Sequence, residues 1–292
     1  MESREKQKYQ FHFRPLAAAA VAVLLLVCSY YCLILNRPGR TRTELRGSGD
    51  DLRIATVNIN NFKFATDPEQ TALFLLQAAR KHSPDVICIQ EYYTQWKFTD
   101  EQFYAIFAGD YPYMVNDGQH AIVSRIPIKS HELFEYEQMN SGSYMLTSFE
   151  GRDGRPFSIV SVHLQSTGLY FVKKRDDIRM GTALALLKQN RHIRNSQASD
   201  VHRLVRGLDT PVFVCGDFNS LPLSTAQMRI KRGLKDSFMC AGHGKGYTYR
   251  FMKNLLRIDY IMCDKSFRPL ECIIENAYLS DHRMVVSTFR EL

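Results

Sequence analysis

The sequence predicts a mixed α/β sandwich that follows an N-terminal membrane segment. Three observations support this prediction: short β-branched runs joined only by turns, other such runs joined by long helical stretches, and an uncharged run near the N-terminus. Strands joined by tight turns form antiparallel pairs, so a simple parallel sheet is excluded. The 292 residues are 45% hydrophobic and 23% charged, which also excludes a disordered or fibrous chain.

Residues 16–35 (LAAAAVAVLLLVCSYYCLIL) predict a single transmembrane anchor. A helix of these 20 uncharged residues is about 30 Å long, which matches the hydrocarbon core of a bilayer. A signal peptide is the competing interpretation, but its apolar region is usually shorter and ends at small residues. Four basic residues stand on each side of the run, so the positive-inside rule leaves the orientation open. The predicted order is a basic tail at 1–15, the anchor, a flexible basic linker at 36–50 and a folded domain at 51–292.

The formal net charge of +8 is divided evenly between the N-terminal segment and the domain. Lys and Arg exceed Asp and Glu by four in residues 1–50 and by four in the remainder. A domain with this small excess is compatible with a phosphate-bearing partner but is less basic than a typical nucleic-acid-binding domain. The seven cysteines include no CxxC pair and do not form a disulfide framework, which leaves only a bridge among Cys240, Cys263 and Cys272 open.

The first part of the domain is predicted to form a strand, a helix and a second strand. Arg53–Val57 is a short β-branched run, and Pro68–His82 is predicted to be a helix because apolar residues recur at helical spacing. Ser83-Pro84 stops this helix, because a residue before proline is driven out of the helical conformation. Val86–Ile89 is a second buried strand, and a Tyr-rich loop follows it.

The second part of the domain contains closely spaced strands and one long helical stretch. Asp153-Gly154 is the predicted turn between two of these strands, and Lys173–Leu208 is predicted to be mostly helical. The predicted strands are Ala121–Ser124, Ser143–Phe149, Phe157–His163, Pro211–Cys215, Tyr247–Tyr249, Ile258–Met262 and Met284–Phe289.

Polar residues follow several of the predicted strands at the point where each strand ends. Such residues cluster in space when their strands share a sheet, although a single Asp after a strand is more often a turn residue or a helix cap. Carboxylates and amides, with few histidines and no cysteine, suit Mg²⁺ or Mn²⁺ better than Zn²⁺. The residues that follow these strands are Asn58, Asn60, Glu91, His163, Asp217 and Asn219. Two more places add polar residues: Asp259, which follows Arg257-Ile258, and the Asp281-His282 pair, which precedes the last strand.

The order and spacing of these motifs resemble the endonuclease/exonuclease/phosphatase (DNase I-like) superfamily over roughly residues 52–292. The resemblance implies a four-layer α/β sandwich of two packed mixed β-sheets flanked by helices. It is most specific in GDFNS, RIDYI and SDH. The matching pieces are TVNINNF (56–62), DVICIQE (85–91), AIVSRIPI (121–128), SIVSVHLQS (158–166), VFVCGDFNS (212–220), RIDYI (257–261) and SDHRMVV (280–286).

The resemblance also implies a metal shell that holds Mg²⁺, or alternatively Mn²⁺. Glu91 is the expected principal metal carboxylate, and Asn58, Asn60 and Asp281 complete or orient the shell. Many relatives carry an acid at the position of Asn60, so the affinity or number of metal ions is open at this residue.

The remaining matched residues are expected to carry the chemistry. Asp217 would orient and deprotonate the attacking water, and Asn219 would hold that water or the phosphoryl oxygens. His282, oriented by Asp259, would donate to the phosphate or act as a general base. His163 would contact the phosphate or the leaving oxygen.

The expected function is that of a membrane-anchored, divalent-metal-dependent phosphoesterase. It would hydrolyse a phosphodiester or phosphomonoester by in-line attack of an activated water. The substrate is open between a lipid-linked compound, a small molecule and nucleic acid, so a nuclease acting on DNA or RNA is one alternative. The other is a non-catalytic scaffold of the same fold that binds phosphorylated ligands. Residues 16–35 imply a membrane partner, and no protein partner is inferred.

Two further features allow more than one interpretation. Tyr92, Tyr93 and Trp96 would stack on a base or contact a lipid, or else would pack under a loop. The basic run 173–175 resembles a phosphate clamp, but mixed charges at a helix start are more often a solvated face.

Overall fold

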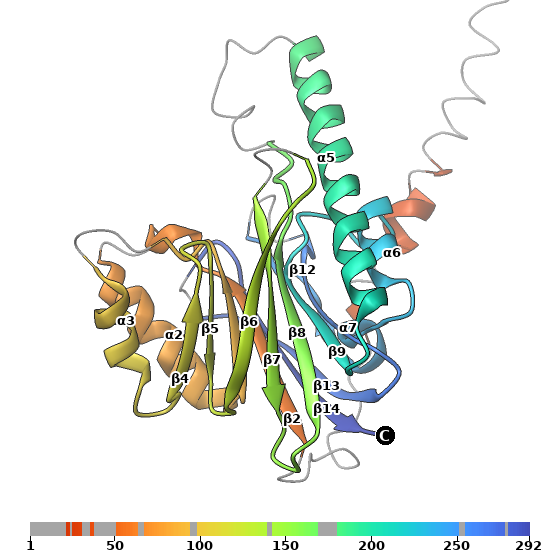
Figure 1. Ribbon diagram of the computed structural model, residues 1–292. Coiled ribbons are helices and arrows are strands. Elements are labelled where there is room, and N and C mark those ends of the chain that lie inside the picture. The colour runs from red at the N-terminus through yellow and green to blue at the C-terminus, as the bar shows by residue number, and fades with distance from the viewer. Residues whose placement is uncertain are drawn as a thin grey trace, which may run out of the picture.

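Two six-stranded mixed β-sheets pack face to face, and helices cover their outer faces (Figure 1). This computed structural model describes residues 22–23, 25–30, 36–37, 51–63, 67–93, 98–138, 142–168, 180–250, 255–277 and 280–292. The arrangement confirms the predicted α/β sandwich of two packed mixed sheets with flanking helices.

Sheet I has the order β10-β12-β9-β8-β7-β6, and sheet II has the order β13-β14-β2-β3-β5-β4. The strands of sheet I are β10 (Lys235–Asp236), β12 (Asp259–Cys263), β9 (Val212–Asp217), β8 (Pro156–His163), β7 (Ser143–Glu150) and β6 (Ile128–Glu135). The strands of sheet II are β13 (Phe267–Glu275), β14 (Met284–Glu291), β2 (Leu52–Asn58), β3 (Val86–Gln90), β5 (His120–Ser124) and β4 (Tyr113–Asn116).

Each sheet contains one parallel pair at its centre, and a helix connects the two strands of each pair. β2 and β3 are parallel in sheet II, and α2 (Pro68–His82) joins them. β8 and β9 are parallel in sheet I, and α5 (Met180–Gly207) joins them. Parallel neighbours need such a crossover, so the carboxyl ends of both strands in a pair lie at the same edge of the sheet. This topology places polar residues that follow these strands side by side.

Three hydrophobic clusters hold the four layers together. The cluster between the sheets contains Ile54 and Cys88 of sheet II and Phe213 and Cys215 of sheet I. A second cluster joins sheet II to α2 and α3 (Asp100–Phe107), and a third joins sheet I to α5 and α6 (Thr225–Lys231). Burial of this apolar surface is the main force that docks the layers.

Helix α2 has the exact bounds that the sequence pattern predicts. The side chain of Asp67 caps its start by accepting from the backbone N–H of Glu69, and Pro68 occupies the first turn. Ser83 ends the helix with a left-handed φ of 50°. The Asp153-Gly154 turn between β7 and β8 is also confirmed.

The prediction of a strand at Tyr247–Tyr249 is wrong. The described strand in this region is β11 (Gly244–Lys245), and only Tyr249 forms isolated bridges, to Leu256 and His282. Three glycines (Gly242, Gly244 and Gly246) stand just before this segment, and it has no continuous apolar run, so it forms single bridges instead of a ladder. β11 instead pairs antiparallel with β1 (Asn36–Arg37), which immediately follows the predicted anchor.

Several sequence predictions fall wholly or partly outside the described residues. Of the predicted anchor, only residues 22–23 and 25–30 are described, and they are helical. Across the part of the chain that the structure describes, no helix is both long and apolar enough to cross a membrane. Residues 38–50 of the linker, the basic run 173–175 and Trp96 lie outside the described ranges. Cys263 and Cys272 are free thiols, so no disulfide links any two of Cys240, Cys263 and Cys272.

Candidate active site

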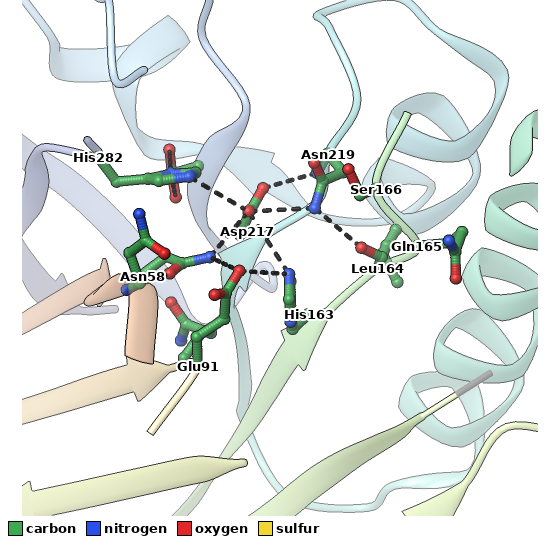
Figure 2. A network of polar contacts seen from close by, with 12 residues as sticks. Asn58, Glu91, His163, Leu164, Gln165, Ser166, Asp217, Asn219 and His282 are labelled. Atoms are coloured by element: carbon green, nitrogen blue, oxygen red, sulfur yellow. Dashed lines mark hydrogen bonds and ion pairs between the residues drawn. The ribbon is translucent and has the colours of Figure 1, made fainter. Parts of the chain in front are cut away.

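The predicted site residues come from both sheets and meet at one edge of the sandwich. In sheet II, β2 ends at Asn58, and Glu91 directly follows β3. In sheet I, β8 ends at His163 and β9 ends at Asp217. The antiparallel strand β12 begins at Asp259, directly opposite Asp217. The sandwich therefore assembles one polar cluster from residues far apart in the sequence (Figure 2).

The Asn58 amide links the two sheets at the centre of this cluster. Its Nδ2 donates to Oε1 of Glu91 at 2.9 Å and to Oδ2 of Asp217 at 3.2 Å. The Nε2 atom of His163 lies 3.5 Å from Oε1 of Glu91 and 3.8 Å from Oδ2 of Asp217. Glu91, His163 and Asp217 therefore face a common point, as Figure 2 shows.

Asn219 holds the Asp217 carboxylate in place. Its backbone N–H donates to Oδ1 of Asp217 at 2.8 Å, and its Nδ2 donates to Oδ2 at 3.1 Å. The same Nδ2 donates to the backbone oxygen of Leu164 at 2.9 Å. Asn219 has a left-handed φ of 46°, a conformation that asparagine adopts more readily than most residues. The short turn after β9 therefore fixes the direction in which Asp217 points.

His282 forms a buried pair with Asp259 and faces Asp217 on its other side. Its Nδ1 lies 3.1 Å from each Asp259 carboxylate oxygen, and its Nε2 lies 3.7 Å from Oδ2 of Asp217. Burial opposes protonation of the imidazole, but the charges of Asp259 and Asp217 outweigh it and raise the His282 pKa to about 10. This ring is therefore a cation at neutral pH that can donate from Nε2.

Asp217 is almost completely buried, with 1% of its surface exposed. Burial raises its pKa to about 6, although the neighbouring His282 charge acts in the opposite direction. The carboxylate is therefore ionised at neutral pH but close enough to its pKa to accept a proton. A group with this property suits general-base chemistry.

The residues around Glu91 fit a hard divalent cation. Its Oε1 accepts from Asn58 and its Oε2 accepts from Nδ2 of Asn61 at 3.0 Å, while a quarter of the side chain stays exposed. The amide oxygen of Asn61 is buried and has no hydrogen-bond partner among the described residues, so it is an oxygen donor available beside this carboxylate. Oxygen donors of this kind are what Mg²⁺ and Mn²⁺ prefer.

A second group of possible metal ligands is Asp217, Asp259 and His282, whose ligand atoms lie within 4.8 Å of one another. Both oxygens of Asp259 already contact Nδ1 of His282, which holds that nitrogen in a hydrogen bond. This group is therefore better described as an imidazole between two carboxylates than as a metal site. The residues around Glu91 form the better cation site.

The two outer members of the predicted metal shell lie at the margin of the cluster. Nδ2 of Asn60 donates to Oδ1 of Asp281 at 3.0 Å, and the backbone N–H of Asn60 donates to Oδ1 of Asn58 at 2.9 Å. These contacts orient Asn58 and hold Asp281 near the site. Within the described residues, neither Asn60 nor Asp281 forms a direct hydrogen bond to Glu91.

The backbone around Glu91 is held in left-handed conformations. Asn60, Asn61 and Phe62 have φ values of 50°, 53° and 56°, and Glu91 has a φ of 51°. Asparagine tolerates this region, but a glutamate there is uncommon and costs about 1–3 kcal/mol. The backbone N–H of Asn61 donates to the backbone oxygen of Glu91 at 3.1 Å, and this hydrogen bond joins the turn after β2 to the turn after β3. Such strain is typical of functional sites.

Gly216 allows β8 and β9 to approach closely beside the predicted site residues. Its φ is 139°, and a Cβ atom there would lie 1.9 Å from the backbone oxygen of Val162. No side chain fits this space, so only glycine lets His163 and Asp217 stand on neighbouring strand ends.

A buried polar face of α5 was not predicted from the sequence, although it positions the loop after His163. Asn190 donates to the backbone oxygen of Thr167 at 3.1 Å, and Arg194 donates to that of Gln165 at 3.0 Å. Gln197 accepts from the backbone N–H of Gln165 at 2.7 Å. These three side chains lie one helical turn apart and clamp the loop that Asn219 contacts from the other side.

Replacing Arg194 with alanine is expected to lower kcat by about 10- to 100-fold, with a smaller change in KM, because the loop that follows His163 and contacts Asn219 loses an anchor. Burial lowers the pKa of Arg194, and the Asp217 charge opposes this shift, so the guanidinium also lies within electrostatic reach of the site. Arg191, which is exposed on the same helix, supplies the matched control Arg191→Ala. Steady-state kinetics and thermal melts of Arg194→Ala and Arg194→Lys measure the effect. A lower melting temperature with unchanged kcat would assign Arg194 a purely structural role.

Tyr92 packs inside the fold and does not face the site. Its ring is fully buried against Phe62 and Phe103, and its hydroxyl donates to Asp100 at 2.9 Å. The packing interpretation therefore holds for Tyr92, whereas Tyr93 is exposed.

Comparisons with known proteins identify the family and the fold. A family model described as the endonuclease/exonuclease/phosphatase family matches residues 55–282. Nocturnin from Drosophila melanogaster is 25% identical over 225 residues, which are 66% of this chain and 32% of that protein. The chain thus spans about a third of the length of this curated relative.

Two solved structures share the fold at low sequence identity. A humanized D. rerio TDP2 has a TM-score of 0.63 and 19% identity, covering 83% of this chain and 100% of that one. The human Nocturnin catalytic domain with a bound sulfate anion has a TM-score of 0.62 and 18% identity, covering 88% of this chain and 100% of that one.

Proposed function

Because this chain belongs to the endonuclease/exonuclease/phosphatase family, we propose that it is a membrane-attached, divalent-metal-dependent hydrolase of phosphoester bonds. The observation that supports this proposal best is the position of Asp217. Its buried carboxylate is held by Asn219 and stands between His282 on one side and Glu91 with His163 on the other. An acid, an imidazolium and a metal-competent carboxylate around one point suit in-line attack on phosphorus.

The side chains divide the chemistry of hydrolysis between them. Asp217 accepts the proton of the attacking water, and the Asn219 amide orients that water or a phosphoryl oxygen. Asp259 keeps Nδ1 of His282 engaged, so Nε2 donates to a phosphate oxygen on which negative charge develops. His163, with 27% of its side chain exposed, is available to the leaving oxygen.

Glu91 would hold the divalent ion, with Asn58, Asn60, Asn61 and Asp281 beside it. When bound, Mg²⁺ or Mn²⁺ would neutralise phosphate charge, which otherwise repels the attacking oxygen. Asn58 contacts both Glu91 and Asp217. It would therefore fix the position of the ion relative to the Asp217 carboxylate, which would activate the water.

Removal of divalent metal is expected to abolish hydrolysis. The full chain, purified in detergent, is assayed on bis(p-nitrophenyl) phosphate with Mg²⁺, with EDTA, and with EDTA followed by excess Mg²⁺ or Mn²⁺. We expect the rate to fall by at least about 10²-fold in EDTA and to return on addition of metal. A rate that EDTA leaves unchanged would rule out metal-dependent catalysis, and metal binding without any turnover would support the non-catalytic scaffold.

The membrane part of the proposal rests on residues 16–35. Extraction of the full chain from membranes tests it: a protein that leaves the membrane in carbonate without detergent is not anchored by a spanning segment.

A nuclease remains the alternative within the same reaction class. Single-stranded DNA and RNA, used as substrates in the hydrolysis assay above, distinguish it from a small-ester or lipid phosphoesterase.

A further inference from the structure

Two loops beside the active site expose leucines to solvent. Leu221 and Leu223 lie between β9 and α6 and are 36% and 49% exposed, and Leu255 lies before β12 and is 51% exposed. We call these three residues the apolar rim. Scattered single leucines are common on protein surfaces, so the apolar rim indicates an interaction surface only if its residues lie together and next to the site.

The two loops of the apolar rim are joined to each other. The hydroxyl of Tyr260 contacts the backbone oxygen of Ser220 at 2.7 Å and that of Arg257 at 3.0 Å. Ser220 directly precedes Leu221, and Arg257 stands two residues after Leu255. The three leucines therefore occupy neighbouring segments.

The apolar rim also lies next to the catalytic residues. Leu221 stands two residues after Asn219, which holds Asp217. On the other loop, the backbone oxygen of Leu256 accepts from the N–H groups of Thr248 and Tyr249 at 2.9 and 3.1 Å. The ring of Tyr249 lies 4.6 Å from that of His282. A substrate phosphate at Asp217 and His282 would therefore have these leucines at the edge of its site.

Leu223 occupies an unfavourable backbone conformation. Its φ is 67°, a left-handed value that glycine or asparagine adopts more easily than leucine. The turn is fixed by hydrogen bonds from the Leu223 N–H to Gln227 at 3.1 Å and from the Ser224 N–H to Leu221 at 3.1 Å. Because half of the side chain is exposed, packing within the fold does not account for an apolar residue there.

The N-terminal chain joins the domain near the same rim. The uncharged run 16–35 ends immediately before β1, and the backbone of β1 pairs with Gly244–Lys245. Lys245 stands three residues before Thr248, a separation of at most about 11 Å, and Thr248 is bonded to Leu256. The described helical residues within that run are exposed, and most of them are apolar, among them Leu25 and Leu26. The point at which the anchor would leave the bilayer is thus on the active-site side of the domain.

We propose that the apolar rim docks on the lipid surface in which the N-terminal segment is anchored, so that the site hydrolyses the phosphoester of a membrane lipid. This inference rests on the phosphoesterase function proposed above. The leucines would enter the boundary between headgroups and acyl chains, and the headgroup phosphate would reach Asp217 without leaving the bilayer.

The first test compares a lipid with a soluble substrate. The full chain is reconstituted into vesicles of phosphatidylcholine, phosphatidylethanolamine, phosphatidylglycerol and sphingomyelin in equal parts, and lipid products and bis(p-nitrophenyl) phosphate hydrolysis are measured in parallel. Leu223→Asn combined with Leu255→Gln is expected to lower the lipid rate about tenfold or more and the soluble rate less than about twofold. Asparagine suits the left-handed position 223, so this variant is expected to fold.

The second test measures contact with lipid and does not depend on activity. Leu223→Trp, in a Trp96→Phe background, is reconstituted into vesicles whose acyl chains carry bromine, which quenches tryptophan fluorescence on contact. Leu73, on α2, is 48% exposed and gives the matched control Leu73→Trp in the same background. We expect quenching at position 223 and little at position 73.

The outcomes separate this inference from the proposed function. Loss of lipid hydrolysis alone in the rim variant, with quenching at 223, supports the inference. Hydrolysis of the soluble ester without any lipid hydrolysis, equal lipid rates in wild type and variant, or equal quenching at 223 and 73 would overturn it and leave the phosphoesterase function standing. Failure to hydrolyse either substrate would overturn both.

Discussion

Replacing Asp217 with asparagine is expected to lower the rate of phosphoester hydrolysis by about 10³-fold at neutral pH, because the site would lose the carboxylate proposed to accept the proton of the attacking water. No neighbouring group takes over this role. His282 stays paired with Asp259, whose charge continues to raise the His282 pKa and favours the protonated ring, and His163 lies 3.8 Å away on the other side. Steady-state kinetics on a soluble phosphodiester, at saturating Mg²⁺, measure the loss.

Two further substitutions make this expectation specific. Asp259→Asn removes the charge that pairs with His282 and also helps to raise the Asp217 pKa, but it leaves the Asp217 carboxylate in place, so we expect a smaller loss than for Asp217→Asn. Asp153→Asn changes an exposed carboxylate in the β7–β8 turn and is expected to leave the rate unchanged. Circular dichroism establishes that each variant is folded. A folded Asp217→Asn protein that keeps more than a tenth of the wild-type rate would contradict the assigned role.

Replacing Arg257 with methionine is expected to destabilise the fold by about 3–5 kcal/mol, because it leaves a buried carboxylate without its partner. Arg257 is 1% exposed, and its two terminal nitrogens each donate to an Asp236 oxygen at 2.9 Å. Its guanidinium also lies 4.7 Å from the ring centre of Tyr260. Urea unfolding of the full chain in detergent, monitored by circular dichroism, measures the change.

A second substitution separates the loss of a partner from the loss of packing. In the double variant Arg257→Met with Asp236→Asn, no buried charge is stranded, and asparagine can still cap α7 (Ser237–Ala241) by accepting from the Phe238 N–H. The double variant is therefore expected to regain part of the lost stability. If it is less stable than Arg257→Met alone, the ion pair is not the source of the effect.

The sequence predicted the central strands and the residues at their ends because both carry local signals. β2, β3, β8 and β9 are buried on both faces, so each appears as a short continuous apolar run. Edge strand β6 was missed because most of its side chains are exposed, which leaves no apolar pattern. Edge strand β13 contains Pro269 beside a register shift, a residue that argues against a strand unless it lies at an edge.

Helix α3 and the polar face of α5 show two different reasons for a missed feature. Thr99 and Gln102 form a capping box at the start of α3, so the region predicted as a Tyr-rich loop contains a local helix signal. Asn190, Arg194 and Gln197 carry no such signal. Their meaning depends on which loop packs against α5, and only the tertiary structure supplies that information.

The division of the site between the two sheets affects the order of events when this enzyme unfolds. Asn58 and Glu91 belong to one sheet, and His163, Asp217 and Asp259 belong to the other. A slight separation of the sheets should therefore end catalysis before any strand has melted. During denaturation, inactivation should therefore precede the loss of the circular dichroism signal. A newly made chain would likewise stay inert until both halves have docked, which protects its surroundings from an unfinished hydrolase.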